Sequence, residues 1–198
     1  MLSKKQQIIK RIFDIVLCLV GAVIILIPIL ILIIVATIST RKFGLFSQLR
    51  VGQYSKIFCI YKIRTMQDHS NDNFITIKDD QRITRAGKFL RHYKLDELPQ
   101  LFNVLIGNMS LVGPRPDVLG YADKLEGKNR SILSVKPGIT GPATLVFRDE
   151  ETLLAKHKDP LSYNNEVIWP QKIQLNRQYV ENWSLKKDIN YILQTIFN

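Results

Sequence analysis

An apolar run from Ile12 to Ile38 constrains this chain more than any other feature of its sequence. Only Asp14, Pro28 and Thr37 interrupt the apolar and small residues of the run. Its 27 residues would form a straight helix about 40 Å long, whereas the hydrocarbon core of a membrane is about 30 Å thick. We therefore expect this segment to lie in lipid, and the mixed polar and apolar sequence after Thr40 to form a soluble domain.

Pro28 lies near the middle of the run and predicts a bend or break in its helix, because proline leaves the carbonyl of Ile24 without a hydrogen-bond donor. Basic residues flank the run on both sides, and positive flanks are typical of cytoplasmic segments. They are Lys4, Lys5, Lys10, Arg11, Arg41, Lys42 and Arg50. We predict that residues 1–40 form a re-entrant membrane helix that enters and leaves by the cytoplasmic face. A tilted span with a proline kink is the alternative.

The charge of the chain indicates anionic partners. Lys and Arg number 28 against 17 Asp and Glu, for a formal net charge of +11. Beside a membrane segment, lipid headgroups and phosphorylated substrates explain this charge better than nucleic acid, because no recognition helix or aromatic stacking pattern accompanies it. The two cysteines, Cys18 and Cys59, favour packing thiols in a reducing compartment over a disulfide framework.

Residues 41–198 are predicted to form one cytosolic catalytic domain of the α/β (α+β) class, mostly helical with a short β-hairpin. The alternation from Lys56 to Lys62 predicts a strand or two within Ser47–Met66, with a turn at Gly52. Helical spacing follows Thr84, a plausible N-cap, and then runs from Leu95 to Leu105 with Pro99 in the first turn. Amphipathic helices that suit a membrane surface are predicted over Ile168–Tyr179 and Leu185–Phe197.

Two local features are candidates for chemistry. Asp96 and Glu97 fall near a predicted helix start, where exposed amides favour carboxylates whatever their function. Arg115 lies between Pro114 and Pro116, which already restrict the backbone. Little further entropy is lost when its guanidinium binds a phosphate. A proline-flanked arginine in a surface loop is also explained by solvation alone.

The order of several short motifs along the chain is more specific than any one of them. They are Phe46-Ser-Gln-Leu-Arg-Val-Gly52, Tyr61-Lys-Ile-Arg-Thr-Met66, Ile83-Thr-Arg-Ala-Gly-Lys-Phe-Leu-Arg91, Leu95-Asp-Glu-Leu-Pro-Gln-Leu-Phe-Asn-Val104, Met109-Ser-Leu-Val-Gly-Pro-Arg-Pro116, Lys136-Pro-Gly-Ile-Thr-Gly141 and Tyr179-Val-Glu-Asn-Trp-Ser184. In this order they closely resemble the bacterial sugar transferases known as monotopic phosphoglycosyl transferases.

The resemblance implies a re-entrant N-terminal helix and interfacial helices under a small domain at the inner (cytoplasmic) membrane. It also implies transfer of sugar 1-phosphate from a UDP-sugar to polyprenyl (undecaprenyl) phosphate with release of UMP. This reaction begins the synthesis of capsule, exopolysaccharide, O-antigen or glycoprotein glycans.

By the same resemblance, Asp96 attacks the sugar-linked phosphorus and forms a covalent intermediate. Bringing anions together calls for Mg²⁺, held by the Asp96 carboxylate and substrate oxygens, and for cationic side chains. Glu97 is expected to assist in metal or proton handling. The candidates for substrate phosphate contacts are Lys62, Arg64, Arg115 and Arg148. The histidines, His69, His92 and His157, show no ligand spacing.

The chain departs from the common family pattern at three places. After Gly141, where many members continue with Trp-Gln, this chain reads Pro142-Ala-Thr-Leu-Val-Phe-Arg-Asp149. Asn176 replaces a frequent acid, and Ser55-Lys56 replaces an expected Gly-Lys. Donor sugar, pathway and oligomeric state are therefore left open. A pyrophosphate hydrolase and a basic membrane adaptor without catalysis are the rival hypotheses.

Overall fold

The computed structural model describes residues 2–67 and 80–197, so His69 lies outside the described residues. Its elements, with η marking 3-10 helices and the π-helical turn η5, follow in chain order. They are α1 (Lys4–Thr40), β1 (Leu45–Val51), η1 (Gln53–Ser55), β2 (Ile57–Ile63), α2 (Arg85–His92), η2 (Leu95–Glu97), α3 (Gln100–Ile106), β3 (Ser110–Val112), η3 (Ala122–Lys124), η4 (Gly127–Ser134), β4 (Gly138–Thr140), α4 (Pro142–Val146), α5 (Glu150–Leu154), α6 (Pro160–Tyr163), η5 (Asn164–Ile168), α7 (Trp169–Glu181) and α8 (Leu185–Phe197).

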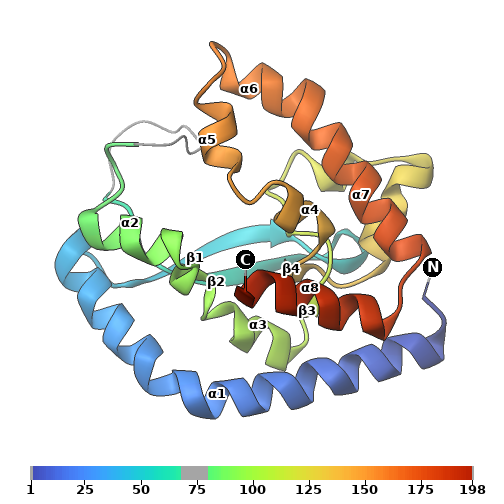
Figure 1. Cartoon of the computed structure of the whole chain (residues 1–198), viewed down its shortest axis with the longest axis horizontal. Coiled ribbons are helices and arrows are strands. Elements are labelled where there is room, and N and C mark those ends of the chain that lie inside the picture. The colour runs from blue at the N-terminus through green and yellow to red at the C-terminus, as the bar shows by residue number, and fades with distance from the viewer. Residues whose placement is uncertain (1, 68–79, 198) are drawn as a thin grey trace.

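The first helix, α1, is one continuous helix of 37 residues with Pro28 inside it. The predicted change of direction is found, because α1 bends and its two arms run along two sides of the rest of the chain (Figure 1). The helix is bent and not interrupted, since one missing hydrogen bond leaves those of the neighbouring turns in place. Cys18 in the first arm packs against Val104 and Met109, whereas Ile29 and Ala36 belong to a cluster around β2 and α2.

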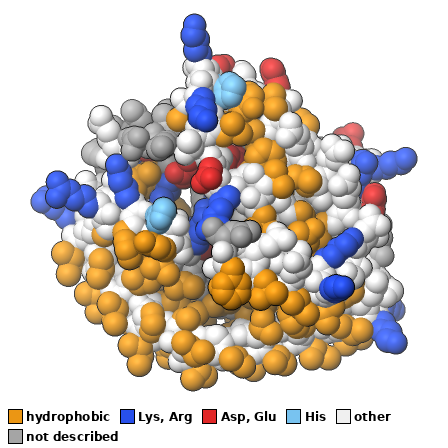
Figure 2. Space-filling view, in the orientation of Figure 1, with side chains coloured by type: hydrophobic (Ala, Val, Ile, Leu, Met, Phe, Trp, Pro, Cys, Tyr) orange, Lys and Arg blue, Asp and Glu red, His pale blue; other side chains and the backbone are white. Residues whose placement is uncertain are grey.

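The outer side of α1 is apolar and exposed. In its most apolar stretch the mean hydropathy is 3.4, yet only 11% of the residues are buried, so this is no core helix of a soluble protein. Hydrophobic side chains line the lower rim of the molecule where α1 runs (Figure 2). By length and composition α1 can cross or enter a membrane.

The predicted hairpin is confirmed. Strands β1 and β2 pair antiparallel, from Leu45 opposite Ile63 to Val51 opposite Ile57. The turn between them begins at Gly52 and contains η1. Val51, Ile60 and Ile63 are each 2% exposed, so the hairpin forms the centre around which the helices pack.

Helix α2 begins as predicted, with the Thr84 hydroxyl accepting a hydrogen bond from the amide of Gly87. Gly87 also lets α2 approach β2, because a Cβ there would lie 2.1 Å from the carbonyl oxygen of Thr65. The next predicted helix is divided. Leu95–Glu97 is the 3-10 turn η2, and α3 begins only after Pro99, which cannot donate to a preceding turn.

A second, parallel pair of strands was not predicted. Ser110 pairs with Gly138 and Val112 with Thr140. Their backbones come so close that a Cβ on Gly138 would lie 2.0 Å from the amide nitrogen of Gly113. This contact fixes the start of the proline-rich loop that carries Arg115.

The last two helices, α7 and α8, agree with the predicted helices near the C-terminus. Asp188 in α8 is fully buried and accepts hydrogen bonds from Lys10 of α1, at 2.6 Å, and from Tyr179 and Trp183. The whole is a mixed, mainly helical fold with a small β-hairpin and a long apolar N-terminal helix.

Candidate active site

The two candidate carboxylates, Asp96 and Glu97, lie in η2 between α2 and α3. Lys94, with φ of 56°, turns the backbone into the left-handed region just before them. This turn points both side chains inward, and each residue is only 8% exposed. Burying a charge costs free energy unless nearby groups compensate it, so the surroundings of each carboxylate determine its chemical role.

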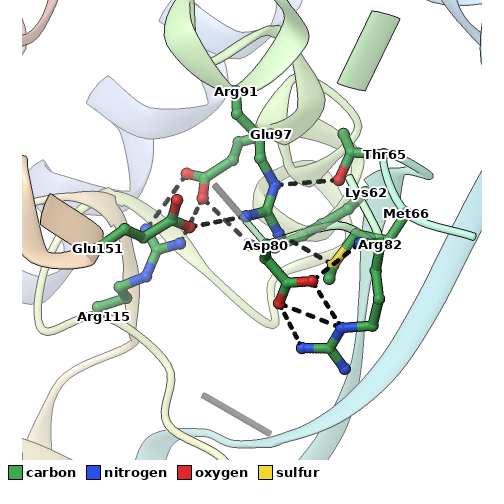
Figure 3. A network of polar contacts seen from close by, with 9 residues as sticks. All are labelled: Lys62, Thr65, Met66, Asp80, Arg82, Arg91, Glu97, Arg115 and Glu151. Atoms are coloured by element: carbon green, nitrogen blue, oxygen red, sulfur yellow. Dashed lines mark hydrogen bonds and ion pairs between the residues drawn. The ribbon is translucent and has the colours of Figure 1, made fainter. Parts of the chain in front are cut away.

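Glu97 is held by two cations from distant parts of the chain. The ammonium of Lys62, on β2, lies 3.2 Å from Oε1 of Glu97. The guanidinium of Arg115 donates to both carboxylate oxygens (Figure 3). Burial by itself raises the pKa of Glu97, but the charges of Arg115 and Lys62 outweigh it and leave this pKa below its ordinary value. Glu97 is therefore a fixed anion.

Asp96 is in the opposite situation. It accepts no hydrogen bond from the residues that the structure describes, and burial, followed by the charge of Glu97, raises its pKa. Lys62, Arg91 and Arg115 lie near enough to favour its ionised form without pairing with it. Two adjacent carboxylates thus differ in kind, since Glu97 anchors cations and Asp96 is left available for chemistry.

Of the four cations predicted for substrate, two lie at the carboxylate pair. Lys62 and Arg115 contact Glu97, and the Arg115 side chain keeps 39% of its surface exposed to meet a further anion. Arg64 instead donates from Nε to the carbonyl of Phe43, with its guanidinium over the ring of Phe46. Arg148 is half-buried after α4, and no hydrogen bond joins it to Asp96 or Glu97.

Arg91 is a member of this site that the sequence argument did not single out. Its guanidinium donates to the Thr65 hydroxyl at 3.1 Å and to Oε1 of Glu151 at 2.7 Å (Figure 3). Its position five residues before Asp96, at the end of a motif that matches the family, was the available signal.

A second charged group adjoins Arg115 and was also missed. Burial, followed by the charge of Arg115, lowers the pKa of Arg50 to about 10, while burial raises the pKa of Asp117 to about 7. Lys172 of α7, which lies 2.6 Å from Oε2 of Glu150, favours the ionised form of Asp117. These residues come from β1, α5 and α7, so only the folded chain brings them together.

The carboxylates do not by themselves form a metal cage. Within residues 2–67 and 80–197 no group of three or more His, Cys, Asp or Glu side chains is arranged to hold an ion. Magnesium differs from metals that need such a cage, since it is bound through one or two carboxylates and the oxygens of a phosphorylated substrate. The Asp96 carboxylate, free of hydrogen bonds to described residues, fits that requirement.

Fold and site together define a class of protein in which a long apolar helix packs against a mixed domain that buries two unlike carboxylates beside cationic side chains. Comparison with known proteins agrees with this class. The family model described as bacterial sugar transferase matches residues 5–198, and the chain belongs to this family.

Several curated relatives match nearly the whole chain. The uncharacterized sugar transferase EpsL of Bacillus subtilis is 35% identical over 96% of this chain and 86% of its own length. A UDP-glucose:undecaprenyl-phosphate glucose-1-phosphate transferase of Klebsiella pneumoniae is 34% identical over 97% of this chain and 40% of its own. An undecaprenyl-phosphate galactose phosphotransferase of Salmonella typhimurium is also 34% identical, over 98% of this chain and 40% of its own. The chain thus spans about two fifths of the two larger relatives.

Proposed function

We propose that this protein transfers a sugar 1-phosphate from a UDP-sugar to polyprenyl phosphate and releases UMP. The difference between its two buried carboxylates carries the proposal. Glu97 fixes Lys62 and Arg115, whereas Asp96 accepts no hydrogen bond from any described residue. The relatives from Klebsiella pneumoniae and Salmonella typhimurium support it, since both are named as sugar-phosphate transferases that act on undecaprenyl phosphate.

In the first step, an oxygen of the Asp96 carboxylate attacks the phosphorus that bears the sugar. A bond forms between this oxygen and phosphorus, the bond to the bridging oxygen breaks, and UMP leaves with the electron pair. The product is an acyl phosphate of Asp96 that carries the sugar. Arg115 and Lys62 would stabilise the negative charge that develops on the phosphate oxygens.

In the second step, an oxygen of polyprenyl phosphate attacks the same phosphorus. The bond to Asp96 breaks, the carboxylate is regenerated and the sugar leaves as a polyprenyl diphosphate. Because Glu97 holds Lys62 and Arg115 throughout, both cations stay in place while Asp96 changes from carboxylate to acyl phosphate and back.

Magnesium is the proposed cofactor. Asp96, together with phosphate oxygens of the substrate, would hold it, and the ion would neutralise phosphate charge. Glu97 is committed to its two cations, so we assign it to positioning Lys62 and Arg115 in place of metal binding.

We further propose that the protein lies on the cytoplasmic face of the inner membrane, with α1 entering and leaving by that face. The exposed side chains of α8, among them Leu193, Ile196 and Phe197, would rest in the interface. Cysteines introduced at Lys5 and Arg41, in a background without Cys18 and Cys59, test this topology. Labelling of both from the cytoplasm is expected, and labelling from opposite sides would exclude the hairpin.

The decisive assay measures UMP release by detergent-solubilised protein from a panel of UDP-sugars, with Mg²⁺ and with or without polyprenyl phosphate. Turnover should need the lipid and should fall at least about 1000-fold in Asp96→Asn, because the nucleophile is lost. Glu181→Gln removes one exposed acid from α7 and serves as the control, with activity near wild type.

Each rival hypothesis has its own outcome. UMP release that continues without polyprenyl phosphate identifies a hydrolase. Silence of the folded wild-type protein across the panel favours the membrane adaptor. A radiolabelled sugar phosphate that stays on the wild-type protein, but not on Asp96→Asn, supports the covalent step.

A further inference from the structure

A cavity of about 430 Å³ lies beside the first turns of α1, away from the carboxylate pair. One wall comes from α1, and the other comes from Ser110 at the start of β3 and from the segment Ser134–Lys136. The cavity therefore lies where the lipid-compatible helix meets the soluble part of the chain.

Cationic groups outnumber anionic groups around this cavity. Lys4, Lys10, Arg11 and Lys136 line it, against the single carboxylate of Asp14. Lys10 is already paired with Asp188, at 2.6 Å. Positive charge is thus left without a counter-ion at this end of α1.

Lys136 and Arg11 converge on one point, since a Cβ on Gly107 would lie 3.4 Å from Nη2 of Arg11 and 3.4 Å from Nζ of Lys136. Arg11 donates to the carbonyls of Val104 and Leu105 at the end of α3. Lys136 forms no hydrogen bond or ion pair with the described residues. Burial, followed by the charge of Arg11, lowers the pKa of Lys136, so a nearby anion would stabilise its charged form.

The apolar part of the cavity continues onto the outer side of α1. Leu2, Ile8, Ile12 and Val135 line it, and Ile8 and Ile12 are 60% and 58% exposed. A ligand that fits has an anionic head for Lys136 and an apolar tail that can follow α1 into the membrane.

We propose that this cavity is a binding site for the headgroup phosphate of an anionic membrane phospholipid. The phosphate lies against Lys136, with Arg11 and Lys4 nearby, and the acyl chains lie along Ile8 and Ile12. The bound lipid holds the first arm of α1 at the membrane surface.

This site is distinct from the proposed transfer site, because the two lie at opposite ends of α3. Asp96 and Glu97 precede the helix, whereas Gly107 caps its C-terminal end. The seven residues of α3 alone separate them by about 10 Å. A phosphate in the cavity is therefore not the acceptor that reacts at Asp96, and the proposal does not depend on the proposed reaction.

Native mass spectrometry of the full chain in detergent, with added phosphatidylglycerol or phosphatidylcholine, tests the site. Wild-type protein should retain one phosphatidylglycerol and no phosphatidylcholine. Lys136→Gln should weaken retention at least about tenfold, because a charge-assisted hydrogen bond in a partly desolvated cavity is lost. Lys136→Arg should restore retention. The matched control is Lys128→Gln, which removes an exposed charge from η4.

Salt separates a site from general attraction to a basic protein. Any loss of retention in the control Lys128→Gln should vanish at high ionic strength, whereas the loss in Lys136→Gln should persist, since partly buried charges are screened less. Equal losses in both variants would overturn the proposal. So would displacement of phosphatidylglycerol by millimolar inorganic phosphate, which would identify a site for free phosphate. Unchanged melting temperatures ensure that a loss reflects binding and not unfolding.

Discussion

Asp96 and Glu97 are neighbours in the sequence with the same chemical group, and the fold gives them opposite properties. The difference arises because the two side chains have different partners. The Glu97 carboxylate faces Lys62 and Arg115, while that of Asp96 pairs with neither. Ion pairing lowers the pKa of one carboxylate, and burial raises the pKa of the other. Glu97 thus keeps its negative charge paired with two cations, while the carboxylate of Asp96 remains unpaired.

Glu97→Gln should destabilise the protein by about 3 kcal/mol. The substitution leaves Lys62 and Arg115 close together without their anion, and breaking a buried pair is costly because a buried charge loses its partner. The partial exposure of Arg115, at 39% of its side chain, places the value at the low end of the usual range. Urea denaturation in detergent measures it. Asp96→Asn, which breaks no ion pair, is the control and should change stability by under about 1 kcal/mol.

The raised pKa of Asp96 predicts that the acid limb of the pH–rate profile for transfer is shifted to higher pH. Attack needs the ionised carboxylate, so kcat/KM should rise with pH through a midpoint above the ordinary aspartate value of about 4. Asp117, with a pKa of about 7, is the other group that titrates nearby. If Asp117→Asn removes the acid limb while activity remains, Asp117 and not Asp96 is responsible for it.

The sequence identified only some of the site residues that lie in motifs, because a motif does not show which of its side chains face the site. Lys62, Arg115 and the carboxylate pair stand in such motifs, and they do meet. Arg50 and Arg91 also lie in motifs and were missed. Arg50 reaches the site because β1 runs beside the proline-rich loop, where its guanidinium donates to the carbonyl of Pro116 at 3.3 Å. No local pattern encodes a contact between residues 66 positions apart.

At the scale of elements, α5 places two successive acids on cations around the site. Glu150 pairs with Lys172 and Glu151 with Arg91. Helix α5 follows the stretch in which this chain departs from the common family pattern. In the free protein, the carboxylate of Glu151 thus occupies Arg91, and a substrate phosphate that bound Arg91 would have to displace it.

Glu151→Gln should therefore lower the KM for the UDP-sugar. The ion pair is partly exposed, with 24% of the Arg91 and 46% of the Glu151 side chain accessible, so its removal is worth at most about 1 kcal/mol, or fivefold in KM. Steady-state kinetics at fixed polyprenyl phosphate measure the change. Glu181→Gln, the matched control on α7, breaks the weak pair with Arg177 and should leave KM unchanged. A rise in KM for Glu151→Gln would show that Glu151 helps to bind substrate.

The elements that sequence predicted are those fixed by local signals. Alternation gave the β1–β2 hairpin, a threonine cap gave the start of α2, and Gly107, with φ of 95°, ends α3. The parallel pair β3–β4 was missed because its three-residue strands are joined over a long connection, and their backbone hydrogen bonds form only where glycines let the two strands come close. Likewise, η2 was taken as helix because helical spacing does not distinguish a 3-10 turn from the α-helix after it.

At the scale of the whole molecule, α1 is more than a detachable anchor. Both of its arms contribute to the buried clusters, and Arg11 caps the end of α3. A buried ion pair also joins α1 to α8, where Lys10 meets Asp188. Asp188 accepts three hydrogen bonds there, so its charge is fully compensated in a place without water access.

Asp188→Asn should consequently destabilise the entire protein by about 3–5 kcal/mol, because Lys10, with 7% of its side chain exposed, would be left buried without its counter-ion. Since Lys10 belongs to α1 and Asp188 to α8, both helices should unfold in one transition at lower denaturant concentration. Circular dichroism reports mainly α1, the longest helix, and tryptophan fluorescence reports Trp183 beside Asp188 together with Trp169 of α7. Lys186→Gln, an exposed change two residues away, should leave the curves unmoved. Separate transitions for the two signals would mean that α1 folds independently of the rest of the chain, as the predicted domain boundary at residue 40 would allow.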